Sequence, residues 1–261
     1  MDDIEIYLNR LFPEKAVYAG LSKNFGGAKI SCADELRSYI DQHKGLSLKV
    51  YVSNEETENK AVDEVSAVLE KAAAEDKLSL SITVDEFLNL IDSEAHLTSQ
   101  AKPRSLVHRD GDLHPAVHIW IIKRKDMGIY VLLQKRSHEK DISPDCFDVS
   151  AAGHVSQGEE FRSSAVRETE EELGLKIHGS RLELIGLHRC QNDEGNIHDN
   201  ELRAVYLCRE PVDTEHMKLQ KSEVSEVCWA EVDEMLASMG TSDFHHCIDL
   251  SELQMIKKAV F

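Results

Sequence analysis

The sequence predicts an α/β (α+β) protein in which a small N-terminal α/β domain precedes a mixed β-sheet packed between helices. In the first hundred residues, helical and strand-like apolar patterns alternate. Beyond residue 105, apolar strand candidates outnumber helices and flank one central helix, which is typical of a mixed sheet covered by helices. The polar, proline-containing stretch SQAKPRS at residues 99–105 separates the two patterns. We therefore predict one domain over residues 1–98 and a second, with C-terminal helices, over residues 106–261.

The N-terminal segment reads as a series of short elements. Apolar residues at helical spacing in residues 4–12 predict a helix before Pro13. Thr83, with Glu86 three residues later, predicts a capping box for a helix over residues 84–95. Between these two helices the patterns predict a helix over 33–45, a strand over 46–52, a helix over 59–76 and a strand over 78–82. No motif in this segment carries chemistry, so we interpret it as a packing or dimerisation domain of unknown role.

The second segment begins with a predicted hairpin, because the apolar runs 116–122 and 129–136 are joined by a turn that contains Gly128. An irregular stretch, a short apolar segment and a loop lead from there to a glutamate-rich helix. After that helix, strands are predicted over 182–190, 202–210 and 226–232, and terminal helices over 232–239 and 251–261.

Composition and charge exclude several classes of partner. The chain has 261 residues and a formal net charge of −18, with 48 acidic against 30 basic residues, which would repel a phosphate backbone. No window approaches the roughly 18 consecutive apolar residues that span a bilayer, and the first ten residues are acidic. The six cysteines are scattered without a CxxC pair, which favours reduced thiols. We expect a cytoplasmic protein with no nucleic-acid polymer and no membrane among its partners.

The stretch GHVSQGEEFRSSAVRETEEELGL, residues 153–175, concentrates negative charge on one predicted helix. A helix over residues 160–173 that ends at Gly174 places Glu168, Glu171 and Glu172 on one face. Like charges at this spacing cost about 0.2 to 0.5 kcal/mol per pair. A solvated acidic face would explain the run, but so would Mg²⁺, which prefers oxygen ligands and uses one or two protein carboxylates directly.

Neighbouring residues favour the cation site. Arg167 stands eight residues beyond Glu159, so that an ion pair could lock the preceding loop onto the helix. Gly153 and Gly158 give this loop the backbone freedom to bring carbonyl groups close to a metal. The apolar stripe that would bury the helix contains one hydroxyl, that of Thr169, which we expect to bond a nearby backbone carbonyl.

In this register the stretch resembles the signature of the Nudix hydrolase superfamily, over about residues 105–240. The matching positions are Gly153, Glu159, Arg167, Glu168, Glu171, Glu172, Gly174 and Leu175. Thr169 is the departure, because the signature has a bulky aliphatic residue there.

The resemblance implies a Nudix fold that cleaves a nucleoside diphosphate linked to another moiety, or a similar small diphosphate. It implies that Glu168, Glu171 and Glu172 bind Mg²⁺ or Mn²⁺ with help from the carbonyl of Ala152 or Gly153, and that Glu168 orients or deprotonates water. Glu159, Arg167 and Gly174 would be structural. Arg136, before the irregular loop, is a candidate for binding the substrate phosphate, with a surface ion pair as the alternative.

One branch of the superfamily, isopentenyl-diphosphate isomerase, is also similar. It has a separate metal site of histidines and acidic residues, and such ligands suit Mn²⁺, Fe²⁺ or Zn²⁺. Ala152, however, stands where the isomerase has its proton-handling cysteine, and a methyl group cannot exchange a proton. The residues that resemble the isomerase site are His108, His114 and His118, His154 beside the signature, and Asp199 and Glu201.

The sequence therefore favours a hydrolase in which Glu168 and Glu171 are catalytic. Glu201 would be an additional metal ligand or general base. An isomerase-type enzyme and a non-catalytic sensor of a nucleotide-linked metabolite are the alternatives. The substrate is left open, and a homodimer is considered.

Overall fold

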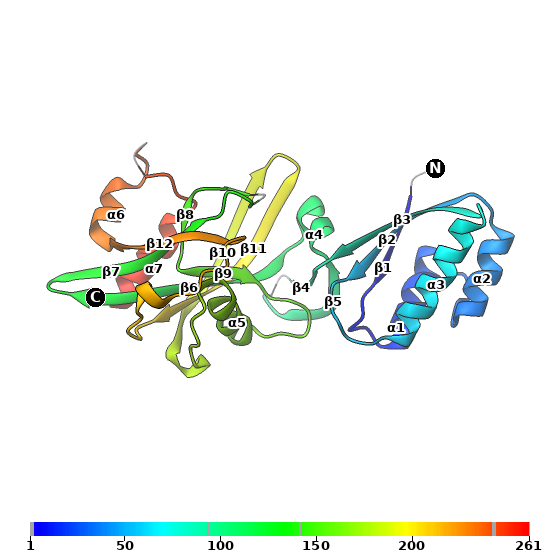
Figure 1. Cartoon of the computed structure of the whole chain (residues 1–261), viewed down its shortest axis with the longest axis horizontal. Coiled ribbons are helices and arrows are strands. Elements are labelled where there is room, and N and C mark those ends of the chain that lie inside the picture. Colours follow the sequence, from blue (N-terminus) through cyan, green and yellow to red (C-terminus); the bar gives the residue numbers. More distant parts are fainter. Residues whose placement is uncertain (1–2, 93, 141, 242–243, 261) are drawn as a thin grey trace. The chain divides into compact units, whose positions relative to one another are not determined.

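The computed structural model describes residues 3–92, 94–140, 142–241 and 244–260, and its described residues form two compact units (Figure 1). One unit comprises the segments Met1–Leu88 and Gln100–Val107, and the other comprises Asn89–Ser99 and His108–Phe261. The sequence-based division into domains over residues 1–98 and 106–261 stays a prediction.

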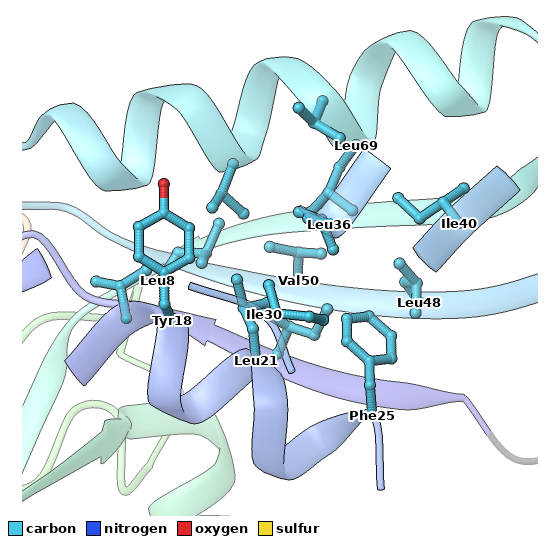
Figure 2. Close-up of a cluster of buried hydrophobic side chains, with 14 of the residues drawn as sticks. Leu8, Tyr18, Leu21, Phe25, Ile30, Leu36, Ile40, Leu48, Val50 and Leu69 are labelled. Carbon is cyan, nitrogen blue, oxygen red and sulfur yellow. The ribbon is translucent and has the colours of Figure 1, made fainter. Parts of the chain in front are cut away.

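The first unit is a three-stranded parallel sheet in the order β1-β2-β3. Alternating apolar residues of the strands pack against the apolar stripes of the helices, and Figure 2 shows this core with Leu8, Leu48 and Val50 of the strands beside Leu21 and Leu69 of the helices. The elements are β1 (Ile4–Leu8), α1 (Glu14–Asn24), α2 (Ala33–Gln42), β2 (Leu46–Ser53), α3 (Lys60–Ala74) and β3 (Leu78–Asp85).

Two helices predicted in this region are wrong. Residues 4–8 form β1, because Ile6 and Leu8 are buried as it pairs with β2, more than forty residues further along the chain. Thr83 lies inside β3, and Phe87–Ile91 forms β4, which pairs with β5 (Leu97–Pro103). Strand β5 extends into the polar stretch 99–105, which was expected to separate the two domains. Strand pairing outweighs the local helical pattern in both places. Residue 93 of the second predicted helix lies outside the described residues.

The second unit contains a seven-stranded sheet in the order β10-β11-β6-β7-β12, with β8 on β7 and β9 on β6. The β11–β6 pair is parallel and the others are antiparallel, so the predicted mixed sheet is confirmed. Its strands are β6 (His114–Lys125), β7 (Gly128–Arg136), β8 (Phe147–Asp148), β9 (Ala151–His154), β10 (Leu182–Glu194), β11 (Ile197–Cys208) and β12 (Val224–Glu231).

Helices cover both faces of this sheet. On one face, α5 (Phe161–Leu173) buries Ala165 and Leu173 against Val117 and Ile119 of β6. On the other face, α6 (Val232–Ser238) and α7 (Leu250–Val260) pack against Trp120. Helix α4 (Arg104–Asp110) and two single 3₁₀ turns, Gly179–Arg181 and Thr214–His216, complete the elements. The last residue of the predicted terminal helix, 261, lies outside the described residues.

Among the described residues, no helix is both long and apolar enough to cross a membrane.

Candidate active site

Helix α5 carries the glutamates, and its C-terminal end follows from its sequence. It ends at Gly174, whose φ of 69° is left-handed, and the Gly174 N–H donates to the Glu170 carbonyl. Thr169 is buried, and its hydroxyl donates to the Ala165 carbonyl at 2.7 Å, which is the kind of backbone bond expected for this departure from the signature. The hydroxyl is therefore satisfied within the helix.

Arg167 connects the loop to the glutamates. Its Nη2 donates to Glu159 Oε2 at 2.9 Å, and its Nη1 donates to Glu168 at 2.7 Å and to Glu171 at 3.0 Å. Burial alone would lower the pKa of Arg167, but its hydrogen bonds to Glu159 and the charge of Glu168 raise that pKa above the ordinary value. The guanidinium therefore stays charged, and it holds two of the three candidate ligands as well as the loop residue.

Glu172 points in another direction. Its Oε2 accepts hydrogen bonds from the Ala152 N–H at 3.0 Å and from Gln134 Nε2 at 3.2 Å. The side chain is buried, and burial together with the charge of Glu168 raises the pKa of Glu172 to about 8. Without a cation, this carboxyl is therefore protonated at neutral pH.

A glycine is required at position 153 because the carboxylate of Glu168 lies close to the backbone there. A Cβ at this position would overlap the carboxylate of Glu168 and would come within 2.6 Å of its Oε2. The backbone of β9 therefore forms the surface against which Glu168 rests. The predicted backbone freedom applies to Gly158, where φ is 84°, whereas no positive φ is found at Gly153.

The α5 carboxylates, which we call the glutamate centre (Glu168, Glu171 and Glu172), do not converge fully. Among the described residues, the groups of potential ligands whose atoms all lie within 4.8 Å of one another do not include them. Arg167 holds two of the carboxylates, while Glu172 is bound to the β9 backbone. The donors still fit Mg²⁺, which uses one or two carboxylates and completes its shell with water and phosphate. A buried protonated carboxyl beside Glu168 is also a group that a cation would ionise.

Arg136 is engaged inside the protein. Its Nη1 donates to Asp148 Oδ2 at 3.1 Å, and its Nη2 donates to the Ile142 carbonyl at 3.0 Å. The two side chains of the ion pair are 18% and 8% exposed, so this is not the surface pair considered as the alternative. In this structure the guanidinium braces the loop after β7.

Five other predicted residues do come together, and we call them the histidine-carboxylate centre. The rings of His108, His114 and His154 have centroids 5.2 to 5.3 Å apart. His114 also forms a group with Asp199 and Glu201 in which the ligand atoms all lie within 4.8 Å of one another. The centre draws on α4, β6, β9 and β11, where the strand register pairs Glu201 with His114.

The chemistry of the histidine-carboxylate centre suits a transition metal. His114 Nδ1 lies 2.9 Å from the Asp112 carbonyl and must donate to it, so in the neutral ring Nε2 is the acceptor. That nitrogen lies 3.4 Å from Asp199 Oδ1 and 4.0 Å from Glu201 Oε1. Burial alone would raise the pKa of Glu201, but Arg203 and the histidines hold it well below its ordinary value. An ionised carboxylate beside imidazoles is a ligand set for Mn²⁺, Fe²⁺ or Zn²⁺.

His118 does not join this centre. Its Nδ1 donates to Glu252 Oε2 of α7 at 2.8 Å. Glu252 and Arg203 are not among the residues predicted from the sequence. Arg203 Nε donates to Glu201 Oε2 at 2.6 Å. The position of Arg203 two residues after Glu201 on a strand was the available signal, because such residues share a face. Nothing in the sequence pointed to Glu252.

Strand β9 connects the two centres. Consecutive strand residues point to opposite faces of a sheet. Gly153 lies against Glu168, while His154 belongs to the histidine-carboxylate centre. The two centres therefore use neighbouring residues of one strand but opposite faces of the sheet.

Comparison with known proteins gives consistent matches. The family model described as NUDIX domain matches residues 112–248. Nudix hydrolase 3 of Arabidopsis thaliana is 40% identical over 154 residues, which are 58% of this chain and 20% of that protein. An uncharacterised Nudix hydrolase of Clostridium acetobutylicum is 35% identical over 151 residues, 58% of this chain and 72% of that protein. This chain thus spans about a fifth of the plant protein's length.

A solved structure from Deinococcus radiodurans superimposes with a TM-score of 0.48 at 17% identity. The superposition covers 67% of this chain and all of that one.

Proposed function

The chain belongs to the Nudix family, and on that basis we propose that it is a divalent-metal-dependent hydrolase acting on a diphosphate linkage. The substrate would be a nucleoside diphosphate derivative or a similar small metabolite, and the cofactor would be Mg²⁺ or Mn²⁺. The observation that carries the proposal is the placement of Glu168 on the Gly153 backbone with Glu172 hydrogen-bonded to Ala152 beside it. Two of the α5 carboxylates thus lie against neighbouring backbone groups of β9.

The bound cation would neutralise the diphosphate, polarise phosphorus and lower the pKa of bound water. The residues of the chain would orient the ligands and the attacking water. Arg167 fixes the orientation of Glu168 and Glu171 through its Nη1. Glu168, which is 13% exposed, is the group that orients the attacking water and takes its proton. Glu172 lies deeper and supplies a ligand whose protonation is sensitive to pH near neutrality.

The histidine-carboxylate centre supports an additional metal role and favours the second candidate, an isomerase-type enzyme. Its five side chains would hold a transition metal, with Glu201 as ligand or general base. Against this candidate, Ala152 offers no exchangeable proton on its side chain. A small-molecule diphosphate partner, a homodimer and a cytoplasmic location complete the proposal.

A panel of diphosphates separates the candidates. Purified protein with Mg²⁺ or Mn²⁺ is incubated with nucleoside, coenzyme, thiamine and isoprenoid diphosphates, and released phosphate and monophosphate are measured. Hydrolysis of one class supports the hydrolase. Formation of the dimethylallyl isomer from isopentenyl diphosphate would replace it with the isomerase. Saturable binding of a diphosphate without turnover would identify a sensor instead.

A further inference from the structure

The two carboxylate oxygens of Glu201 contact different residues. Oε2 accepts a hydrogen bond from Arg203 Nε at 2.6 Å. Oε1 lies 3.6 Å from His154 Nε2 and 4.0 Å from His114 Nε2. A carboxylate free to rotate would present either oxygen to the histidines. Here the bond to Arg203 selects Oε1.

Arg203 is itself fixed by the C-terminal helix. Its Nη1 donates to Glu252 Oε1 of α7 at 3.5 Å. The other oxygen of Glu252 accepts from His118 Nδ1 at 2.8 Å and from Trp120 Nε1 at 3.3 Å. The side chain of Glu252 is fully buried and that of Arg203 is 11% exposed. Three donors therefore meet one buried carboxylate, and that carboxylate cannot turn away from Arg203 without losing them.

A second contact ties the start of α7 to the same sheet. His188 of β10 stands opposite Arg203 in the β10–β11 register, and its Nε2 lies 2.9 Å from Asp249 Oδ2. Asp249 also accepts from the Ser251 N–H at 2.7 Å in the first turn of α7. The helix is thus held by polar contacts just before its start as well as at Glu252.

Stability alone is a poor explanation of these buried charges. Replacing a buried ion pair by apolar residues of similar volume is often neutral or stabilising. The carboxylates and the guanidinium instead form an ordered line from α7 to the histidines.

We propose that Arg203, held by Glu252 of α7, is a positioning residue that aims one oxygen of Glu201 at the histidine-carboxylate centre. This inference rests on the proposed metal role of that centre. The groups that hold a metal ligand in place are worth about 10- to 100-fold in metal affinity. Helix α7, which is far from the centre in sequence, would then contribute to metal binding at the histidine-carboxylate centre.

The test uses Co²⁺ alone as the probe, because its visible d–d absorption reports on ligand geometry. The 261-residue protein is titrated with Co²⁺, and the absorption that is absent from His114→Asn is assigned to the histidine-carboxylate centre. Arg203→Met should lower the affinity for Co²⁺, measured from that absorption, by about 10- to 100-fold, and should change the shape of the absorption spectrum. Arg203→Lys should restore part of the affinity, since lysine keeps the charge but lacks the planar fork of donors.

Arg181→Met is the matched control. Arg181 pairs with Glu210 at 3.0 Å, and this pair lies at the surface and does not contact the centre. It should leave the Co²⁺ signal unchanged. Glu252→Gln keeps the shape of its side chain and should cause a smaller loss than Arg203→Met, so it provides the test if Arg203→Met does not fold.

Three results would overturn the proposal. If Arg203→Met bound Co²⁺ with the affinity and spectrum of the wild type, Arg203 would not position Glu201, although the metal centre would still exist. Wild-type affinity in Glu252→Gln would remove the link to α7. If the wild-type protein showed no Co²⁺ absorption that depends on His114, the histidine-carboxylate centre would not bind metal. The proposed hydrolase activity would not be affected by that result, because Glu171→Gln and Glu172→Gln test it separately.

Discussion

The backbone of Gly153 lies directly against the carboxylate of Glu168, so close that no Cβ fits between them. Gly153→Ala should therefore push Glu168 away from β9 while leaving the core untouched. We expect a loss in kcat/KM of about 100-fold, which is the scale for a displacement of about 1 Å at a reacting centre. Gly20→Ala is the control, because a Cβ there meets nothing within 4 Å. Activity like that of the wild type in Gly153→Ala would contradict the placement of Glu168.

Glu171→Gln and Glu172→Gln should each lower metal-dependent turnover by orders of magnitude, because a neutral amide neither balances the cation nor binds it well. Glu170→Gln in the same helix is the matched control, since Glu170 pairs with Lys176 at 3.1 Å at the surface. Initial rates with saturating Mg²⁺ provide the measurement. If both variants turned over like the control, these residues would not be the ligands.

Local features of α5 could be predicted from the sequence, and distant ones could not. The end of the helix at Gly174, the ion pair of Arg167 with Glu159 and the backbone bond of Thr169 all follow from residues within one or two turns. Residues 4–8, in contrast, form a strand because of a partner more than forty residues away. Their apolar spacing alone gave the wrong answer.

The same distinction separates the two centres. The glutamates follow one another along a helix, so their spacing alone suggested a cation. The histidine-carboxylate centre depends on the register of β11 and β9 against β6, and only the family resemblance had pointed to it. The link from Arg203 to Glu252 spans 49 residues and has no local pattern.

Removing the metal should make stability depend on the protonation of Glu172. Its pKa is about 8 in the folded protein and 4.5 is its ordinary value, so the folded state keeps a proton that the unfolded state releases. The stability from this group is fully present below pH 4.5 and is lost as pH rises from there through 8, by up to about 1.4 kcal/mol per pH unit.

Both tryptophans, Trp120 and Trp229, lie in the second unit, so their fluorescence during denaturation in EDTA measures this change. Glu172→Gln cannot ionise, and its stability should lack this decline with pH. A wild-type profile that matched the Gln variant between pH 5 and 8 would show that burial does not raise the pKa as described.

Arg136 allows a direct choice between a substrate contact and an internal brace. Arg136→Met leaves Asp148 buried without its partner, which should lower the free energy of unfolding by about 3 to 5 kcal/mol. Arg181→Met, which breaks a surface pair with Glu210, should cost at most about 1 kcal/mol. Tryptophan fluorescence during urea denaturation gives both values. If Arg136 instead gripped the phosphate, the variant would keep its stability and show a raised KM, because the lost contact would be made only to the substrate.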